Sequence, residues 1–138
     1  MSDTFDGGCM CGAIRYRLTE APLMVLACHC ETCRKQSGAA YSVNLAMRSK
    51  AVEIEGEFKT FEDRATESGN PVERDFCGTC GSPIRSRPTY GPPVVAVKAG
   101  TLDDPAPFPP AMHIWTCSKL GWVTIPDGLP QIERNLPG

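Results

Sequence analysis

The chain has 138 residues, of which 41% are hydrophobic and 22% are charged, with a formal net charge of -2. These values are typical of a soluble globular protein, and we expect residues 1–138 to form a single domain. The small acidic balance favours neither nucleic acid nor an anionic membrane surface as a partner. The thirteen prolines and thirteen glycines indicate many turns and short elements.

The start of the chain predicts the compartment. Residues 1–8 are polar, and the apolar run at 22–27 is too short and too late for a signal peptide or a membrane span. We therefore expect a cytoplasmic protein. The cytoplasm is reducing, so the eight cysteines are interpreted as metal ligands before they are interpreted as disulfides.

Most of the predicted elements are short strands. Alternating or apolar residues predict strands at 13–18, 23–28, 39–47, 52–56, 58–61, 72–76, 83–86, 94–99, 112–117 and 122–125. Glycine, proline and polar residues predict a tail at 1–8, loops at 62–71, 88–93 and 103–110, and a loop-like end from 126 onward. Residues 31–37 predict one or two helical turns that end at Gly38. The fold class is therefore mainly β.

Four cysteines in two pairs predict a closed metal site. Cys77 and Cys80 form a C-x-x-C turn between two predicted strands, followed by Gly81, which suits the positive φ of such a turn. Cys9 and Cys11 lie two residues apart, so an extended chain points both sulfurs to one side. Together the pairs supply four thiolates, which leave zinc no vacancy and predict a structural role.

The segment from Cys28 to Cys33 predicts a second and different site. Cys28, Cys30 and Cys33 combine both spacings around one turn, so three thiolates can converge on one ion. Three protein ligands and an exchangeable fourth are typical of reactive zinc. Such a position could take water, a substrate thiolate or a carbonyl oxygen. We therefore expect two zinc ions per chain, one structural and one catalytic.

An alternative is that both sites are structural, with His29 or Cys117 as the fourth ligand of the second one. We expect instead that His29 points away from its neighbouring cysteines, and that Cys117 is a buried free thiol. Arg34 and Lys35 follow the three cysteines and are candidates for binding a carboxylate of an acidic substrate, or form a solvated charged turn. His113 and Trp122 could line a pocket, although structural packing is the expectation for Trp122.

Five motifs occur together in one order, and they carry a family resemblance. They span Gly8–Gly12, Cys28–Gly38, Phe76–Pro83, Val97–Pro105 and His113–Trp122. The chain resembles the glutathione-dependent formaldehyde-activating enzyme family, which also includes centromere protein V, over about residues 8–131. The family often has proline before the last tryptophan of these motifs, where this chain has Gly121.

The resemblance implies a fold and an activity. The fold would be a β-tent of antiparallel sheets clamped by zinc. Cys9, Cys11, Cys77 and Cys80 would match the structural zinc site, and Cys28, Cys30 and Cys33 would match the catalytic one. The implied reaction joins glutathione to formaldehyde, as a carbon–sulfur lyase does in reverse. A non-catalytic binding module and a sensor of zinc or thiol stress remain alternatives, because a fold does not settle function.

Overall fold

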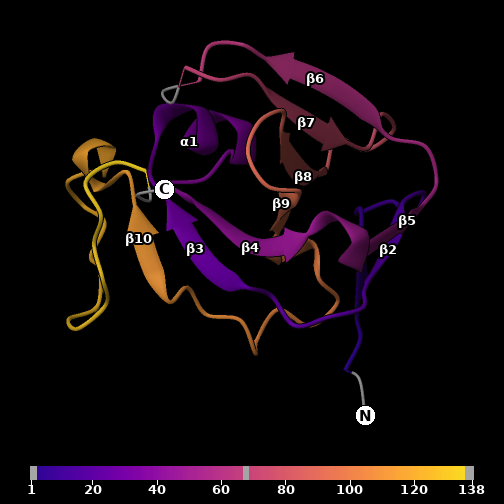
Figure 1. Cartoon of the computed structure of the whole chain (residues 1–138), viewed down its shortest axis with the longest axis horizontal. Helices are drawn as coiled ribbons and strands as arrows, with labels where there is room; N and C mark the ends of the chain where they lie inside the picture. Colours follow the sequence, from indigo (N-terminus) through magenta and orange to yellow (C-terminus); the bar gives the residue numbers. More distant parts are fainter. Residues whose placement is uncertain (1–2, 67–68, 136–138) are drawn as a thin grey trace.

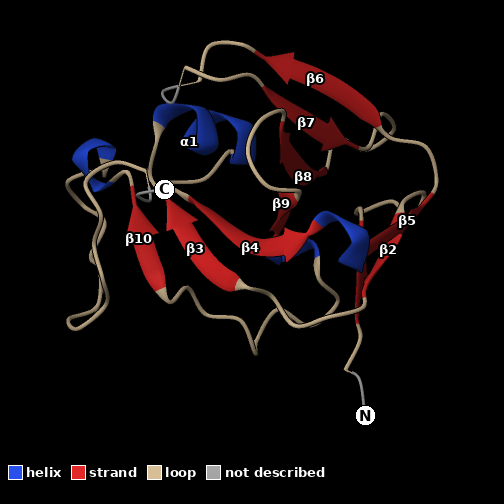
Figure 2. Ribbon diagram, viewed as in Figure 1, coloured by secondary structure: helices blue, strands red, loops and turns tan. Residues whose placement is uncertain are grey.

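The computed structural model describes residues 3–66 and 69–135 and has two β-sheets (Figures 1 and 2). A three-stranded antiparallel sheet has the order β1-β2-β5, and a seven-stranded sheet has the order β10-β3-β4-β9-β8-β7-β6. The strands are β1 (Phe5–Gly8), β2 (Arg15–Leu18), β3 (Met24–Cys28), β4 (Ser42–Arg48), β5 (Val52–Glu55), β6 (Lys59–Asp63), β7 (Val72–Phe76), β8 (Pro83–Pro88), β9 (Val94–Lys98) and β10 (Met112–Ile114). The expectation of a mainly β protein is confirmed.

The helical elements are short. The single α-helix of the described residues, α1 (Glu31–Ser37), follows β3 directly, and three 3-10 turns are η1 (Ser49–Ala51), η2 (Ala99–Thr101) and η3 (Thr116–Ser118). Gly38 ends α1 with a φ of 69°, as its position in the sequence predicted. Within the described part of the chain, no helix has both the length and the apolar character needed to cross a membrane.

The seven-stranded sheet is mixed, whereas antiparallel sheets were expected. β10 pairs with β3 in parallel, from Met112 beside Leu26 to Ile114 beside Cys28, and the other pairs are antiparallel. A parallel pair needs a long crossover between its strands. Here residues 29–111 separate the two strands, and the proline-rich segment 102–111 completes the crossover by carrying the chain from β9 to the edge of the sheet beside β3.

Strand alternation gives the large sheet two different faces. On one face, Leu45, Met47 and Val97 are almost fully buried, and they form one core cluster with Tyr16 and Leu18 of the small sheet. The residues beside them in sequence point to the opposite face. Figure 1 shows how the large sheet bends, with β3 and β4 on one arm, β6 and β7 on the other, and α1 near the open end.

Three predicted elements differ in the structure. Residues 5–8, expected as part of a tail, form β1, where Gly7 leaves room for the ring of Tyr16. The strand expected at 112–117 ends at Ile114, because Trp115 has a φ of 56° and turns the chain into η3. Residues 122–125 form no strand, and Trp122 is 75% exposed. The expectation that Trp122 packs inside the protein is therefore wrong.

Candidate functional site

The structure brings Cys9, Cys11, Cys77 and Cys80 into one cluster. Their Sγ atoms all lie within 4.8 Å of one another, and the cluster could hold a metal ion. The Sγ of Cys11 lies 3.6 Å from that of Cys9 and 3.7 Å from that of Cys77. Tetrahedral zinc with bonds near 2.3 Å separates its sulfurs by about 3.8 Å. The donor set and its spacing therefore fit zinc, and four sulfurs leave no exchangeable position.

Backbone amides and one hydroxyl stabilise these sulfurs. The amides of Thr79 and Cys80 point to the Sγ of Cys77 at 3.4 and 3.5 Å, as expected for a C-x-x-C turn. The Ser82 hydroxyl lies 3.2 Å from the Sγ of Cys80, and its hydrogen bond is the main reason why the pKa of Cys80 is lowered to about 5. Sequence reasoning did not identify Ser82.

The second cluster joins the end of β3 to the start of α1. Cys28 is the last residue of β3, Cys30 is the N-cap of α1, and Cys33 lies in its first turn. All three side chains are buried, and their Sγ atoms lie within 4.8 Å of one another. The Sγ of Cys30 accepts a hydrogen bond from the Cys33 amide at 3.3 Å. This cluster could also hold a metal ion, and it has three sulfurs in place of four.

The close approach of three buried thiols separates their acidities. Hydrogen bonds with Cys28 and Cys33 lower the pKa of Cys30 to about 2. The hydrogen bond with Cys30, followed by the one with Cys33, raises the pKa of Cys28 well above its usual range, and burial adds to the effect. One thiolate is therefore easily formed, while three neighbouring thiolates require a cation between them. The chemistry of the donor set thus fits a bound metal.

Lys98 is a buried cation near the three-cysteine cluster that sequence reasoning missed. Its Nζ donates to Ser42 Oγ at 2.7 Å, and Ser42 Oγ donates to Asn44 Oδ1 at 3.0 Å. Burial lowers the pKa of Lys98 to about 8, although the charge of Cys33 opposes this shift. The signal available in the sequence was a lysine inside the apolar run at 94–99.

Neither proposed fourth ligand joins the cluster of sulfurs. His29 is fully buried, and its Nε2 lies 2.8 Å from Nδ1 of His113, with which it shares a hydrogen bond. The Tyr41 ring lies against His29 with centroids 4.8 Å apart. Burial lowers the pKa of His29 to about 4, so the pair is neutral at pH 7. Cys117 is exposed, which overturns the expectation of a buried thiol.

The two predicted substrate-binding cations lie on α1. Lys35 is exposed, and its Nζ lies 3.1 Å from a Glu31 carboxylate oxygen. Arg34 is half-buried. Neither lies among the described residues that line the cavity beside the cluster. Their role in binding a substrate stays a prediction.

A cavity of about 340 Å³ adjoins the three-cysteine cluster. It lies against the face of the large sheet that points away from the main core. Cys28, Cys30 and Cys33 form part of its wall. Apolar side chains form much of the remainder, including Leu26, Ala46, Val72, Val94, Ala96 and Ile114. The candidate site is therefore a thiol cluster that opens into a largely apolar space.

Among its described residues, the wall of this cavity contains one arginine, whose charge is paired inside the protein. Arg74 is buried, and its Nη2 lies 3.0 Å from an Asp63 carboxylate oxygen, while its Nη1 donates to Ser86 Oγ at 2.9 Å. The Asp63 carboxylate therefore compensates the guanidinium charge inside the protein.

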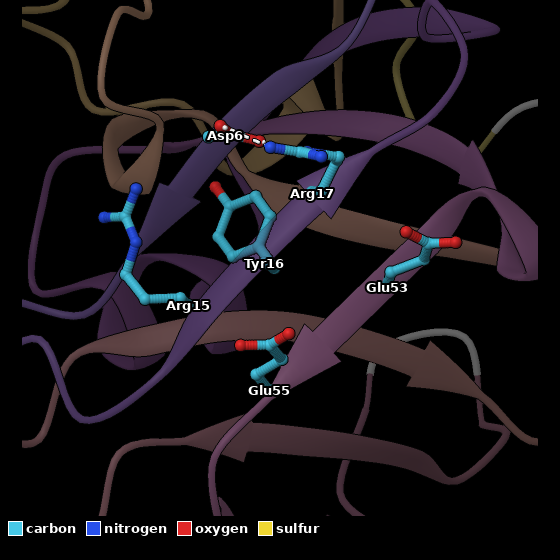
Figure 3. A pocket seen from close by; sticks show the side chains of 6 residues that line it. All are labelled: Asp6, Arg15, Tyr16, Arg17, Glu53 and Glu55. Carbon is cyan, nitrogen blue, oxygen red and sulfur yellow. Dashed lines mark hydrogen bonds and ion pairs between the residues drawn. The ribbon is translucent and has the colours of Figure 1, made fainter.

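A second hollow of about 260 Å³ lies on the small sheet and has a different character (Figure 3). Its lining is charged, and it contains none of the cysteines. Arg17 pairs with Asp6 at 2.9 Å, and Arg15 pairs with Asp103. Figure 3 shows Glu53 and Glu55 on β5 opposite these arginines. Because its charges pair on an exposed surface, this hollow is a weaker candidate than the cavity beside the thiols.

The fold and the site define a small, mainly β protein with two thiol clusters that could bind metal ions. The model of the family described as glutathione-dependent formaldehyde-activating enzyme matches residues 4–118. The chain therefore belongs to this family.

A solved structure supports the fold. The crystal structure of a Rhodobacter sphaeroides protein matches with a TM-score of 0.53 and 17% identity, covering 71% of this chain and 87% of that one. A comparison with curated proteins found no significant match.

Proposed function

We propose that the protein is a zinc-dependent enzyme of the carbon–sulfur lyase type. It adds a small thiol, glutathione, to an aldehyde such as formaldehyde, or it cleaves the adduct. The observation that carries the proposal is the position of three buried cysteines in the wall of a cavity large enough for a substrate. Membership of the family supports glutathione and an aldehyde as the reactants.

The two clusters would hold two zinc ions with different roles. Cys9, Cys11, Cys77 and Cys80 would hold a structural ion that ties the start of the chain to the turn after β7. Cys28, Cys30 and Cys33 would hold the second ion and leave one position for a substrate. When bound there, zinc lowers the pKa of a coordinated thiol or polarises a carbonyl oxygen.

The reaction needs no oxidant or reductant. The thiol sulfur forms a bond to the carbonyl carbon, the carbonyl electron pair moves to the oxygen, and the proton lost by the thiol ends on that oxygen. Cleavage follows the same steps in reverse. The chain's own contribution is to hold the aldehyde beside the cluster and to limit its contact with water. The buried ammonium of Lys98 offsets negative charge at the thiols.

Two further parts of the proposal rest on the sequence. Arg34 and Lys35 would steer the acidic thiol toward α1, as a cationic turn attracts carboxylates. A cytoplasmic location would keep the eight cysteines reduced and supply a small thiol.

The cavity also bears on the alternative of a non-catalytic binding module. Such a module would expose an apolar patch and have no pocket at the three cysteines. The cavity beside Cys28, Cys30 and Cys33 favours the enzyme.

The test compares the purified protein with two cysteine variants. We expect the wild type to accelerate exchange between glutathione, formaldehyde and their adduct, measured by NMR above the uncatalysed rate. Cys30→Ser should lose at least 90% of this acceleration. Cys117→Ser changes an exposed cysteine outside both clusters and is the matched control. Equal rates for wild type and Cys30→Ser would contradict the proposal. One zinc per chain, with the thiols of the three-cysteine cluster free, would contradict it as well.

A further inference from the structure

The cavity beside the three-cysteine cluster is larger than formaldehyde requires. Its volume is about 340 Å³. An apolar cavity of about 150 Å³ is known to hold benzene, and sites for drug-sized ligands begin near 300 Å³. Formaldehyde has two heavy atoms and would leave most of this space to water against apolar walls. The site therefore has room for a substrate of about ten heavy atoms.

The floor of the cavity is built from small side chains on paired strands. Ala46 on β4 lies beside Ala96 on β9, and Ala96 lies beside Ser86 on β8. Arg74 on β7 continues this row beyond Ser86. Alternation places all four on the same face of the sheet. Three of these four side chains are small, so they leave a depression on this face of the sheet. The apolar space of the cavity therefore follows from the residues of the strands themselves.

The cavity offers little to the charged ends of glutathione. Among the described residues that line it, the cation is Arg74, and Asp63 already compensates its charge. Carboxylates placed beside Leu26, Val94 and Ile114 would lose their hydration without gaining a partner. Only the thiol end of glutathione therefore suits the cluster, and the apolar space is left for the other reactant.

We infer that the aldehyde substrate carries an apolar group of about six to eight carbon atoms, in place of the single carbon of formaldehyde. The inference rests on the proposed function, because it assigns the second reactant of that reaction. The thiol sulfur bonds to the carbonyl carbon and the thiol proton ends on the carbonyl oxygen, while the apolar group fills the space above Ala46 and Ala96. The product is a hemithioacetal with an apolar tail.

The first arm of the test measures kcat/KM with glutathione for formaldehyde, butanal, hexanal and heptanal. Each methylene that enters the cavity should raise kcat/KM by about fourfold until the space is full. Ala96→Leu fills the floor and should lower the heptanal-to-formaldehyde ratio of kcat/KM at least tenfold. Ala106→Leu makes the same change on an exposed loop and is the matched control. Val94→Ala enlarges the space, so kcat/KM should keep rising to an aldehyde about one carbon longer than the longest that fits the wild type.

The second arm measures binding without turnover. Benzyl alcohol, which cannot form the adduct, is titrated into the metal-loaded protein while the methyl NMR signals of Leu26, Val94 and Ile114 are followed. We expect these signals to shift in wild type and to shift at least tenfold less at equal ligand in Ala96→Leu. Circular dichroism shows whether Ala96→Leu keeps its fold. If it does not, the aldehyde series measured with Val94→Ala tests the inference in its place.

The two arms separate the inference from the proposed function. If formaldehyde has the highest kcat/KM of the four aldehydes and benzyl alcohol shifts no methyl signal, the inference is overturned and the proposed function stands. Methyl shifts without glutathione-dependent turnover of any aldehyde would overturn the proposed function and the aldehyde as substrate. Rising kcat/KM along the series together with the shifts would support both.

Discussion

The substitution Asp75→Asn tests how the arm of the sheet that forms one cavity wall is held. Asp75 on β7 is fully buried and points to the face opposite the cavity. Arg85 and Arg87 each place Nε within 2.7 Å of the same carboxylate oxygen, and Thr60 donates to the other oxygen at 2.8 Å. Asparagine keeps the shape and removes the charge that these two guanidinium groups share.

The expected loss follows from burial. Removing one partner of a buried ion pair costs about 3–5 kcal/mol, because the remaining charge is left without compensation. Arg87 is one-third exposed and keeps Glu73 at 3.1 Å, so we expect the lower end, about 3 kcal/mol. For a chain of this length that loss lowers Tm by about 10 °C. Urea denaturation at pH 7 measures the free energy of unfolding directly.

The pH dependence provides an internal check. Burial would raise the pKa of Asp75, but hydrogen bonds from Arg87, Arg85 and Thr60 outweigh it and hold the pKa below its usual range. A lowered folded-state pKa gives stability that is fully present above about pH 4 and is lost as the pH falls through the folded value. The difference between wild type and Asp75→Asn should therefore shrink below about pH 4.

Glu73→Gln is the matched control. It removes the charge of a carboxylate on the same strand that also pairs with Arg87, but the Glu73 side chain is 37% exposed. It should cost less than about 1 kcal/mol. A loss below about 1 kcal/mol for Asp75→Asn, equal to that of the control, would refute the reasoning.

The remaining predictions concern the clusters and the buried polar groups. Cys77→Ser should remove the closed metal site and lower Tm more than Cys117→Ser, measured by metal content and thermal unfolding. Lys98→Met should weaken zinc binding at the three-cysteine cluster about 10–100-fold in a chelator competition. Zinc with three thiolates carries a net negative charge, and the variant removes the buried ammonium that stabilises it. Since burial lowers the pKa of His29 to about 4, stability should fall as the pH drops from about 6.5 toward 4, and His113→Phe should reduce the slope in urea titrations.

The local parts of the site could be predicted from the sequence. The spacing of Cys28, Cys30 and Cys33 brings three sulfurs together within one strand end and one helical turn. Each of the pairs that begin at Cys9 and Cys77 brings two sulfurs together locally. A closed site needs four ligands, so it was simple to infer that the two pairs share one ion. The helical turns after Cys30 and their end at Gly38 also followed from local chemistry.

The parts that depend on strand order could not be predicted in the same way. The contact between Lys98 and Ser42 joins residues 56 positions apart, and His29 meets His113 across 84 positions. No local pattern specifies either pair. The cavity likewise exists because Ala46 and Ala96 lie beside each other on paired strands, which a single sequence does not reveal. Trp122 was misjudged because aromatic residues are usually buried, and its exposure depends on where the chain runs after η3.

Metal content by mass spectrometry tests the central claim, which is that one metal site is closed and the other open. Wild type and Cys30→Ser are each measured with and without glutathione. We expect two zinc ions per wild-type chain and one per Cys30→Ser chain. In the cobalt-substituted protein, glutathione should change the cobalt absorption spectrum only when Cys30 is present. Two zinc ions in Cys30→Ser, or a wild-type Cys30 site that is indifferent to glutathione, would contradict the account.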